Sequence, residues 1–248
     1  MSIMLVVIKM KTIWIATSNM HKVEEFQNML QGKANVKCLK DLDKKIEIVE
    51  DGKTFEENAL IKARCLYQVL KEPVISDDSG IEVDAMDKRP GVYSARFMGE
   101  DTDYAIKNQA IIDAVKGKIK TARYVCVIAY IDENGQEKTY RATIEGEIND
   151  RPVGKKGFGY DPIFYYPPFQ TTLANVSEEK KNSVSHRGKA LQMFLKDLEA
   201  TLWLVLFVAD IHQYVLQVHS GTYSESILQS EKKNKARHCI EGRMENSG

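Results

Sequence analysis

Apolar residues recur along this chain at two spacings, and each spacing predicts a different element. Residues 12–17 form a short apolar run typical of a buried strand, and residues 23–30 carry apolar side chains at helical spacing until Gly32. Residues 36–39 predict a second strand. The chain therefore begins as strand, tight loop, helix and strand, the order typical of an α/β fold.

A capping box marks the start of the next helix. Thr54 and Glu57 stand three residues apart, so that each can satisfy a free N–H group of the first turn. The buried stripe of this helix is expected at Phe55, Ala59, Ala63, Leu66 and Leu70, and Pro73 marks its exit. A short strand at 74–75 is then expected to run into a polar turn at 76–80.

The second half predicts one more helix, a hairpin and a final helix. Residues 106–115 show helical spacing before Gly117, and residues 123–131 and 138–148 flank the turn pair Asn134-Gly135. Residues 154–168 are rich in Gly, Pro and aromatic side chains, which favours a rigid loop. The last helix would bury Leu191, Phe194, Leu195, Leu198 and Leu202. Together these elements predict an α/β fold with a mixed sheet.

Composition restricts the classes of partner. The 35 basic and 35 acidic residues of the 248-residue chain cancel, so no global charge favours nucleic acid or a membrane surface. The four cysteines include no C-x-x-C pair, which argues against a zinc or redox site. No apolar run is long enough to cross a bilayer. We expect a cytoplasmic protein whose domain spans 11–202, between an extension at 1–10 and a partly disordered one at 203–248.

Three groups of polar residues are candidates for chemistry. The segment 17–22 joins a strand to a helix N-terminus, where an anion is favoured, although a simple N-cap followed by a solvated lysine explains it equally well. Glu50 and the pair Asp77-Asp78 offer the oxygen ligands that magnesium prefers. A basic cluster precedes the last helix, where a solvated charge run is the usual explanation; its members are Lys180, Lys181, His186, Arg187 and Lys189.

Two aromatic residues of the Gly-rich loop complete the candidates. Phe158 and Tyr160 could stack on a purine ring, and structural plugs are the common alternative. No G-x-x-x-x-G-K-[ST] stretch is present, which disfavours a Walker-type kinase or ATPase.

The ordered set of motifs resembles the inosine triphosphate pyrophosphatase family, the non-canonical purine NTP pyrophosphatases. The segment 17–22 reads TSNMHK and matches the T-x-N-x-x-K opening of that family. The later motifs follow in the family order over about residues 11–202: TFEENA at 54–59, DDSG at 77–80, PGVYSARF at 90–97, GFGYDP at 157–162 and SHRG at 185–188.

The resemblance implies an elongated two-lobed fold with a central active-site cleft, a homodimer and a magnesium cofactor (Mg2+). It implies that Glu50 and Asp78 ligate the metal and that Asp78 also accepts the proton of the attacking water. It implies that the remaining matched positions bind the nucleotide: Thr17, Ser18, Asn19, Met20, His21, Lys22, Ser79, Phe158, Gly159, Tyr160, Asp161, Lys181, His186 and Arg187.

The implied reaction is hydrolysis of ITP, dITP or XTP to the monophosphate and pyrophosphate. Donors from His186, Arg187 or the nearby backbone would pair with the oxygen at purine position 6, and an adjacent cation would keep the pKa of Asp78 low. Two alternatives stay open: a pyrophosphatase of related fold acting on pyrimidine or modified nucleotides, and a nucleotide-binding protein without catalysis.

Overall fold

The computed structural model describes residues 10–200 and residue 211, and the expectations for 1–9 and beyond 200, Leu202 included, lie outside the described residues. The first half follows the predicted order closely. It contains β1 (Met10–Ile15), α1 (Met20–Met29), β2 (Ala34–Cys38), α2 (Phe55–Leu70) and β3 (Val74–Val83). The capping box of α2 is present as predicted, with Thr54 and Glu57 bonded reciprocally.

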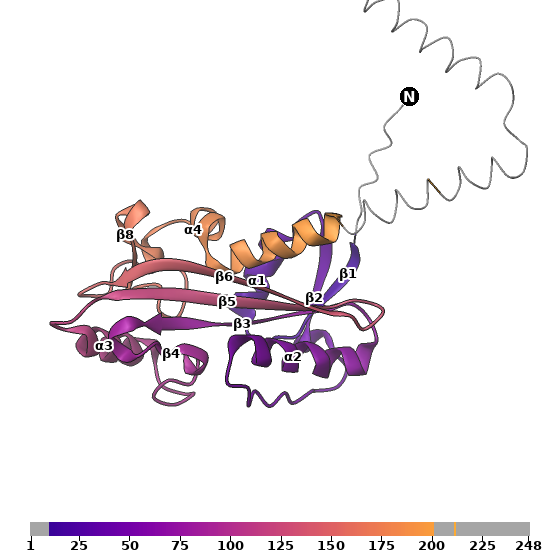
Figure 1. Ribbon diagram of the computed structural model, residues 1–248, viewed down its shortest axis with the longest axis horizontal. Helices are drawn as coiled ribbons and strands as arrows, with labels where there is room; N and C mark the ends of the chain where they lie inside the picture. Colours follow the sequence, from indigo (N-terminus) through magenta and orange to yellow (C-terminus); the bar gives the residue numbers. More distant parts are fainter. Residues whose placement is uncertain (1–9, 201–210, 212–248) are drawn as a thin grey trace, which may run out of the picture. The chain divides into compact units, whose positions relative to one another are not determined.

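The second half supplies most of the sheet (Figure 1). Its elements are β4 (Arg89–Pro90), α3 (Tyr104–Val115), β5 (Thr121–Ile131), β6 (Glu137–Ile148), β7 (Phe164–Tyr166), β8 (Thr171–Thr172) and α4 (Glu178–Val184). Residues 186–200 are helical, and Leu191 and Phe194 are buried as expected. The predicted hairpin is confirmed, because β5 and β6 pair in continuous antiparallel register around Gly135.

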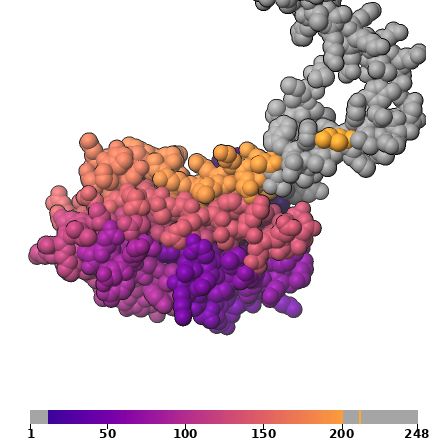
Figure 2. Space-filling view, in the orientation of Figure 1, coloured from indigo at the N-terminus to yellow at the C-terminus, as the bar shows by residue number. Residues whose placement is uncertain are grey.

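The sheet is mixed, as predicted. Its strands follow the order β2-β1-β3-β5-β6-β7-β8, with β4 paired to β3; β1 runs parallel to β2 and β3, and the other pairs are antiparallel. In Figure 1, α2 and α3 lie below the long strands, while α4 and the helix beginning at 186 lie above them. Figure 2 shows the same layers in space-filling form, with the pink strands between purple and orange segments.

Two segments differ from the prediction. Residues 76–80, expected as a turn, continue β3, because β5 pairs with this strand from Val74 to Val83 and satisfies its backbone groups. The polar side chains inside this strand find partners on neighbouring helices, which the local sequence cannot reveal. The stretch 154–168, expected as a loop throughout, contains β7 at Phe164–Tyr166.

Buried side chains form separate clusters toward the two ends of β3 and β5. One cluster packs Val74 and Val127 against Phe55 of α2, and another packs Ile81 and Tyr124 against α3. Between them lie Ser76, Asp77 and Asp78, which are buried and polar. The middle of the sheet therefore holds buried polar residues, whereas apolar packing dominates toward the two ends of β3 and β5.

Candidate active site

A cavity of about 670 Å³ opens at the middle of the sheet. It is lined by the loop between β1 and α1, by Glu50, by the centre of β3, by the Gly-rich loop 157–161 and by the start of the last helix. Of the sixteen residues that the family resemblance singles out, only Met20 and His21 are not among those lining this cavity. Segments far apart in the chain therefore meet in one space.

The loop between β1 and α1 is fixed by its own side chains. The Asn19 side chain caps α1 by accepting hydrogen bonds from the backbone N–H groups of His21 and Lys22, at 3.1 and 3.4 Å. The Thr17 hydroxyl accepts from the Asn19 N–H at 3.2 Å. The N-cap interpretation is thus correct, but Lys22 is not a solvated lysine, since its ammonium pairs with buried Asp77 at 3.1 Å.

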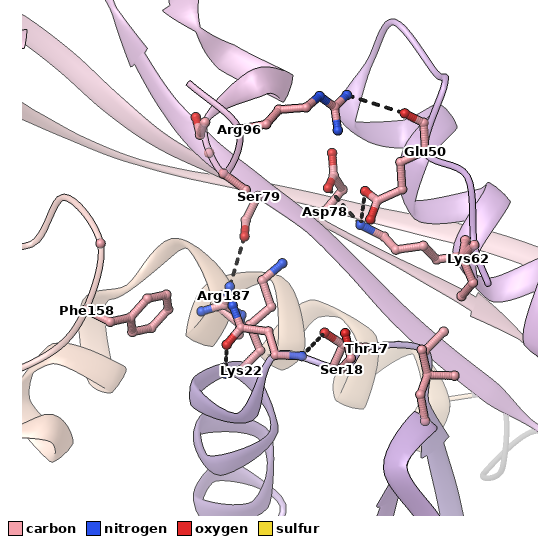
Figure 3. Close-up of a pocket in the computed structure, with 18 of the residues that line it drawn as sticks. Thr17, Ser18, Lys22, Glu50, Lys62, Asp78, Ser79, Arg96, Phe158 and Arg187 are labelled. Carbon is pink, nitrogen blue, oxygen red and sulfur yellow. Dashed lines mark hydrogen bonds and ion pairs between the residues drawn. The ribbon is translucent and has the colours of Figure 1, made fainter. Parts of the chain in front are cut away.

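The two carboxylates expected to bind metal converge on one ammonium group (Figure 3). Lys62 of α2 lies 2.7 Å from Glu50 Oε2 and 2.8 Å from Asp78 Oδ1. Although burial lowers the pKa of Lys62, these two carboxylates raise it above its ordinary value, so the amine stays protonated. Glu50 and Asp78 therefore lie close enough together to share a cation.

The pKa of Asp78 departs from the expectation that a nearby cation keeps it low. Burial raises this pKa and outweighs the lowering by Lys62 and Lys22. The reason is that the side chain is about nine-tenths buried and loses the water that would stabilise its charge. A carboxylate of raised pKa is a stronger proton acceptor.

One wall of the cavity is formed by Phe158, Asp161 and Lys181, and we call it the base-side wall because the resemblance assigns these positions to nucleotide binding. It combines an aromatic ring with buried ions. Lys181 pairs with Glu25 at 2.9 Å and with Asp161 at 2.8 Å, and its ammonium lies 4.8 Å from the centre of the Phe158 ring. Asp161 also accepts from the Phe158 N–H at 2.9 Å, which fixes the loop. Tyr160 is buried, with its hydroxyl donating to the Ser94 carbonyl at 2.7 Å, and it also lines the cavity.

The basic cluster before the last helix is only partly a solvated charge run: Lys180 and Lys189 are exposed, whereas Lys181, His186 and Arg187 are buried. Arg187 is 2% exposed; it donates to Asp77 through Nε and Nη2, to Ser79 at 2.9 Å and to Glu25. These contacts use four of the five N–H groups of its guanidinium. The helix N-terminus is therefore cross-linked by ion pairs to both α1 and β3.

His186 differs from its neighbours in having a free polar atom. Its ring stacks on Tyr124 with centroids 4.7 Å apart, and its Nδ1 is buried with no hydrogen-bond partner in the described part of the chain. Burial and the adjacent Arg187 charge hold the pKa of His186 well below its ordinary value, so the imidazole is neutral. His186 thus adds a neutral ring to the residues that line the cavity.

Residues 13–197 match the Ham1 family. The chain belongs to the Ham1 family. Among curated relatives, the dITP/XTP pyrophosphatase of Exiguobacterium sibiricum is 44% identical over 194 residues, which are 77% of this chain and 96% of that protein. The dITP/XTP pyrophosphatase of Bacillus subtilis is 40% identical over 195 residues, 77% of this chain and 98% of that protein.

Solved Ham1 structures agree with the fold. The Staphylococcus aureus Ham1 protein superposes with a TM-score of 0.71 at 36% identity, covering 77% of this chain and 100% of its own. The nucleoside-triphosphatase, or dITP/XTP pyrophosphatase, of Mycobacterium abscessus gives a TM-score of 0.61 at 35% identity, covering 74% and 98%. The mixed α/β architecture predicted from the sequence is thus the architecture of Ham1 relatives.

Three residues of this Ham1 site were not predicted as site residues from the sequence. Glu25 and Lys62 form buried ion pairs, and Arg96 lines the cavity from the loop after β4. Lys62 carried a signal, because it follows Asn58 by one turn beside the apolar stripe of α2, and a lysine there needs a buried partner. Glu25 similarly stands between the buried residues Val23 and Phe26.

Within residues 10–200, no group of three or more His, Cys, Asp or Glu side chains could hold a metal ion by itself. Glu50 and Asp78 form a pair, which suits an ion whose remaining ligands are phosphate oxygens and water. No helix in the described residues is long and apolar enough to cross a membrane.

Proposed function

We propose that this chain hydrolyses dITP, ITP and XTP to the nucleoside monophosphate and pyrophosphate. The observation that supports the proposal most strongly is the meeting of three groups in one cavity: the loop 17–22, the pair Glu50 and Asp78, and the base-side wall around Phe158. The 40–44% identity to relatives named dITP/XTP pyrophosphatases supports the same substrate class.

Different parts of the cavity would bind different parts of the substrate. The triphosphate would lie against the loop 17–22, with Lys22 and Lys62 facing its negative charge. Phe158 would stack on the purine, since it lines the cavity and its ring is fixed by the Lys181 ammonium 4.8 Å from the ring centre. This placement orients the α-phosphorus toward Asp78, and positioning accounts for most of the catalysis in phosphoryl chemistry.

The bond changes are simple. A water oxygen forms a bond to the α-phosphorus, its proton passes to the Asp78 carboxylate, and the bond from the α-phosphorus to the α,β-bridging oxygen breaks. The electron pair of that bond leaves with pyrophosphate. Asp78 must be ionised to accept the proton, and burial, which raises its pKa, makes the ionised carboxylate a stronger base.

A magnesium ion fits the donor set of this site. Glu50 and Asp78 would hold it, because both are carboxylates that converge on a shared cation, Lys62. When bound, the ion would neutralise charge on the phosphate oxygens and so favour departure of pyrophosphate.

His186 accounts for discrimination against adenine. His186 lines the cavity with a neutral imidazole, and a ring N–H would donate to the oxygen at purine position 6 of hypoxanthine or xanthine. Adenine carries an amino group there, which would leave two donors facing each other. The unpaired donor costs roughly 1–3 kcal/mol, or about 5- to 150-fold in kcat/KM.

A panel of nucleoside triphosphates with pyrophosphate release as readout tests this proposal. We expect ITP, dITP and XTP to be hydrolysed in the presence of Mg2+, and ATP to be a poor substrate. Comparable rates on UTP or dTTP would instead support a pyrimidine-directed enzyme. Nucleotide binding without pyrophosphate release would support a binding protein.

A matched pair of variants tests the role of Asp78. Asp78→Asn should abolish turnover while leaving the circular-dichroism spectrum unchanged. Asp113→Asn is the control, since Asp113 is exposed on α3 and contacts Gln109 rather than the cavity. Wild-type rates in Asp78→Asn would remove this residue from the mechanism.

The remaining expectations rest on the family resemblance. We propose a cytoplasmic homodimer whose catalytic domain is residues 11–202. Analytical ultracentrifugation of the full chain measures whether the protein is a dimer, and a sedimentation coefficient matching a monomer would contradict the proposed homodimer. A chain ending at Leu202 tests the boundary, because it should retain activity and solubility.

A further inference from the structure

The cations that line the cavity differ in whether a carboxylate already neutralises them. Lys22 pairs with Asp77, and Lys62 pairs with Glu50 and Asp78. Lys181 pairs with Glu25 and Asp161, and Arg187 pairs with Glu25 and Asp77. Each of these four charges therefore already has a carboxylate partner within the protein.

Arg96 differs from these four residues. Among the described residues, it is the partly buried cation of the cavity that no carboxylate neutralises. It has no ion pair; its Nη2 donates to the backbone carbonyl of Glu50 at 3.4 Å, and its guanidinium lies 4.9 Å from the centre of the Tyr93 ring. Lys40 and Lys45 also line the cavity without an ion pair, but both are exposed. Arg96 thus brings an uncompensated charge to the wall beside Glu50.

The backbone around Arg96 is held in place on both sides. The Ser94 carbonyl accepts from the Tyr160 hydroxyl at 2.7 Å, and the Ala95 carbonyl accepts from the buried Lys107 ammonium at 2.7 Å. The Arg96 carbonyl accepts from the Gly99 N–H at 2.9 Å. The guanidinium is therefore presented by a fixed loop, which lowers the entropy lost when it binds a ligand.

Figure 3 shows the Arg96 guanidinium extending toward Glu50 and Asp78, whereas Lys22 approaches from helix α1. Four of its five N–H groups are not used by the carbonyl contact, so the fork can bind an anion through two parallel hydrogen bonds. A free, oriented guanidinium beside the proposed metal pair is suited to phosphate oxygens rather than to an uncharged base.

We propose that Arg96 binds the terminal phosphates of the substrate, the part that leaves as pyrophosphate. This inference rests on the proposed function and adds a substrate-binding residue to it. Negative charge accumulates on the leaving group as the α,β bond breaks, so a fixed guanidinium there stabilises the transition state and the bound product. The nucleoside monophosphate, which lacks those phosphates, does not touch Arg96.

Product inhibition separates the two halves of the substrate. The full chain with Mg2+ is assayed on dITP while either inorganic pyrophosphate or deoxyinosine monophosphate is added as inhibitor. For Arg96→Gln we expect the inhibition constant of pyrophosphate to rise on the order of tenfold, the scale of one charge-assisted contact. The inhibition constant of the monophosphate should stay within about twofold of wild type.

Two further variants sharpen the test. Arg96→Lys keeps the charge but loses the planar fork, so its pyrophosphate inhibition constant should lie between those of wild type and Arg96→Gln. Arg89→Gln is the matched control: Arg89 is an exposed arginine of β4 that also donates to a backbone carbonyl, at 3.1 Å, yet does not line the cavity. It should behave as wild type.

The outcomes distinguish this inference from the proposed function. If wild-type protein releases pyrophosphate and Arg96→Gln shows unchanged pyrophosphate inhibition, the inference is overturned and the function stands. If both inhibition constants rise equally, Arg96 acts through the fold and the inference is also overturned. A wild-type protein without pyrophosphate release refutes the proposed function itself, and this inference with it.

Discussion

Replacing Glu25 by Gln tests the buried ion network that joins α1 to the base-side wall. The Glu25 side chain is 11% exposed and binds both the Lys181 ammonium and the Arg187 guanidinium. The substitution keeps the shape of the side chain and removes its charge. Lys181 retains Asp161 as a partner and Arg187 retains Asp77, so the network is weakened rather than dismantled.

The contribution of the Glu25 charge to the folding free energy follows from the pKa of this residue. Burial raises this pKa, but the charges of Arg187 and Lys181 prevail and lower it from 4.5 to about 2. That difference corresponds to about 3 kcal/mol of folding free energy. The folded pKa lies below the unfolded one, so the contribution is complete above pH 4.5 and is lost as the pH falls toward 2.

Urea denaturation of wild type and Glu25→Gln measures this contribution. We expect the variant to be less stable by about 3 kcal/mol at pH 7, with the difference shrinking to roughly 1 kcal/mol at pH 3. Glu24→Gln is the control, because Glu24 is the neighbouring carboxylate on α1 and its side chain is 62% exposed. It should change stability by less than about 0.5 kcal/mol. A Glu25→Gln difference equal at both pH values would refute the reasoning.

Three further outcomes follow from the same structure. Gly80→Ala should destabilise the protein by roughly 1–3 kcal/mol in urea, since its Cβ would lie 2.4 Å from both the Gly91 carbonyl oxygen and the Ser94 hydroxyl oxygen. Phe158→Ala should raise KM for dITP about tenfold with little change in kcat, because stacking on the ring is lost; an unchanged KM would exclude Phe158 as the stacking platform. Chelation with EDTA should stop pyrophosphate release and added Mg2+ should restore it, whereas full activity in EDTA would exclude a metal requirement.

Local sequence patterns correctly predicted the elements that are stabilised by residues close to one another along the chain. The capping box at Thr54 and Glu57 and the turn pair Asn134-Gly135 act within a few positions of the chain, and both are present. The centre of β3 was predicted wrongly as a turn. Polar residues normally interrupt a buried strand, and here the partners that make them tolerable lie on α1, on α2 and at residue 187, distant in sequence.

The sequence by itself determined the α/β class, the order of the elements and the candidate polar residues. The motifs also carried the family resemblance, because they stand in a fixed order along the chain. Only the tertiary structure decided how charges are paired: Lys62 holds Glu50 and Asp78 together, Glu25 pairs with Lys181 and Arg187, and Arg96 has no ion pair among the residues that the structure describes. Electrostatic interactions act over a few ångströms in space regardless of chain separation, so only the folded arrangement sets which charges meet.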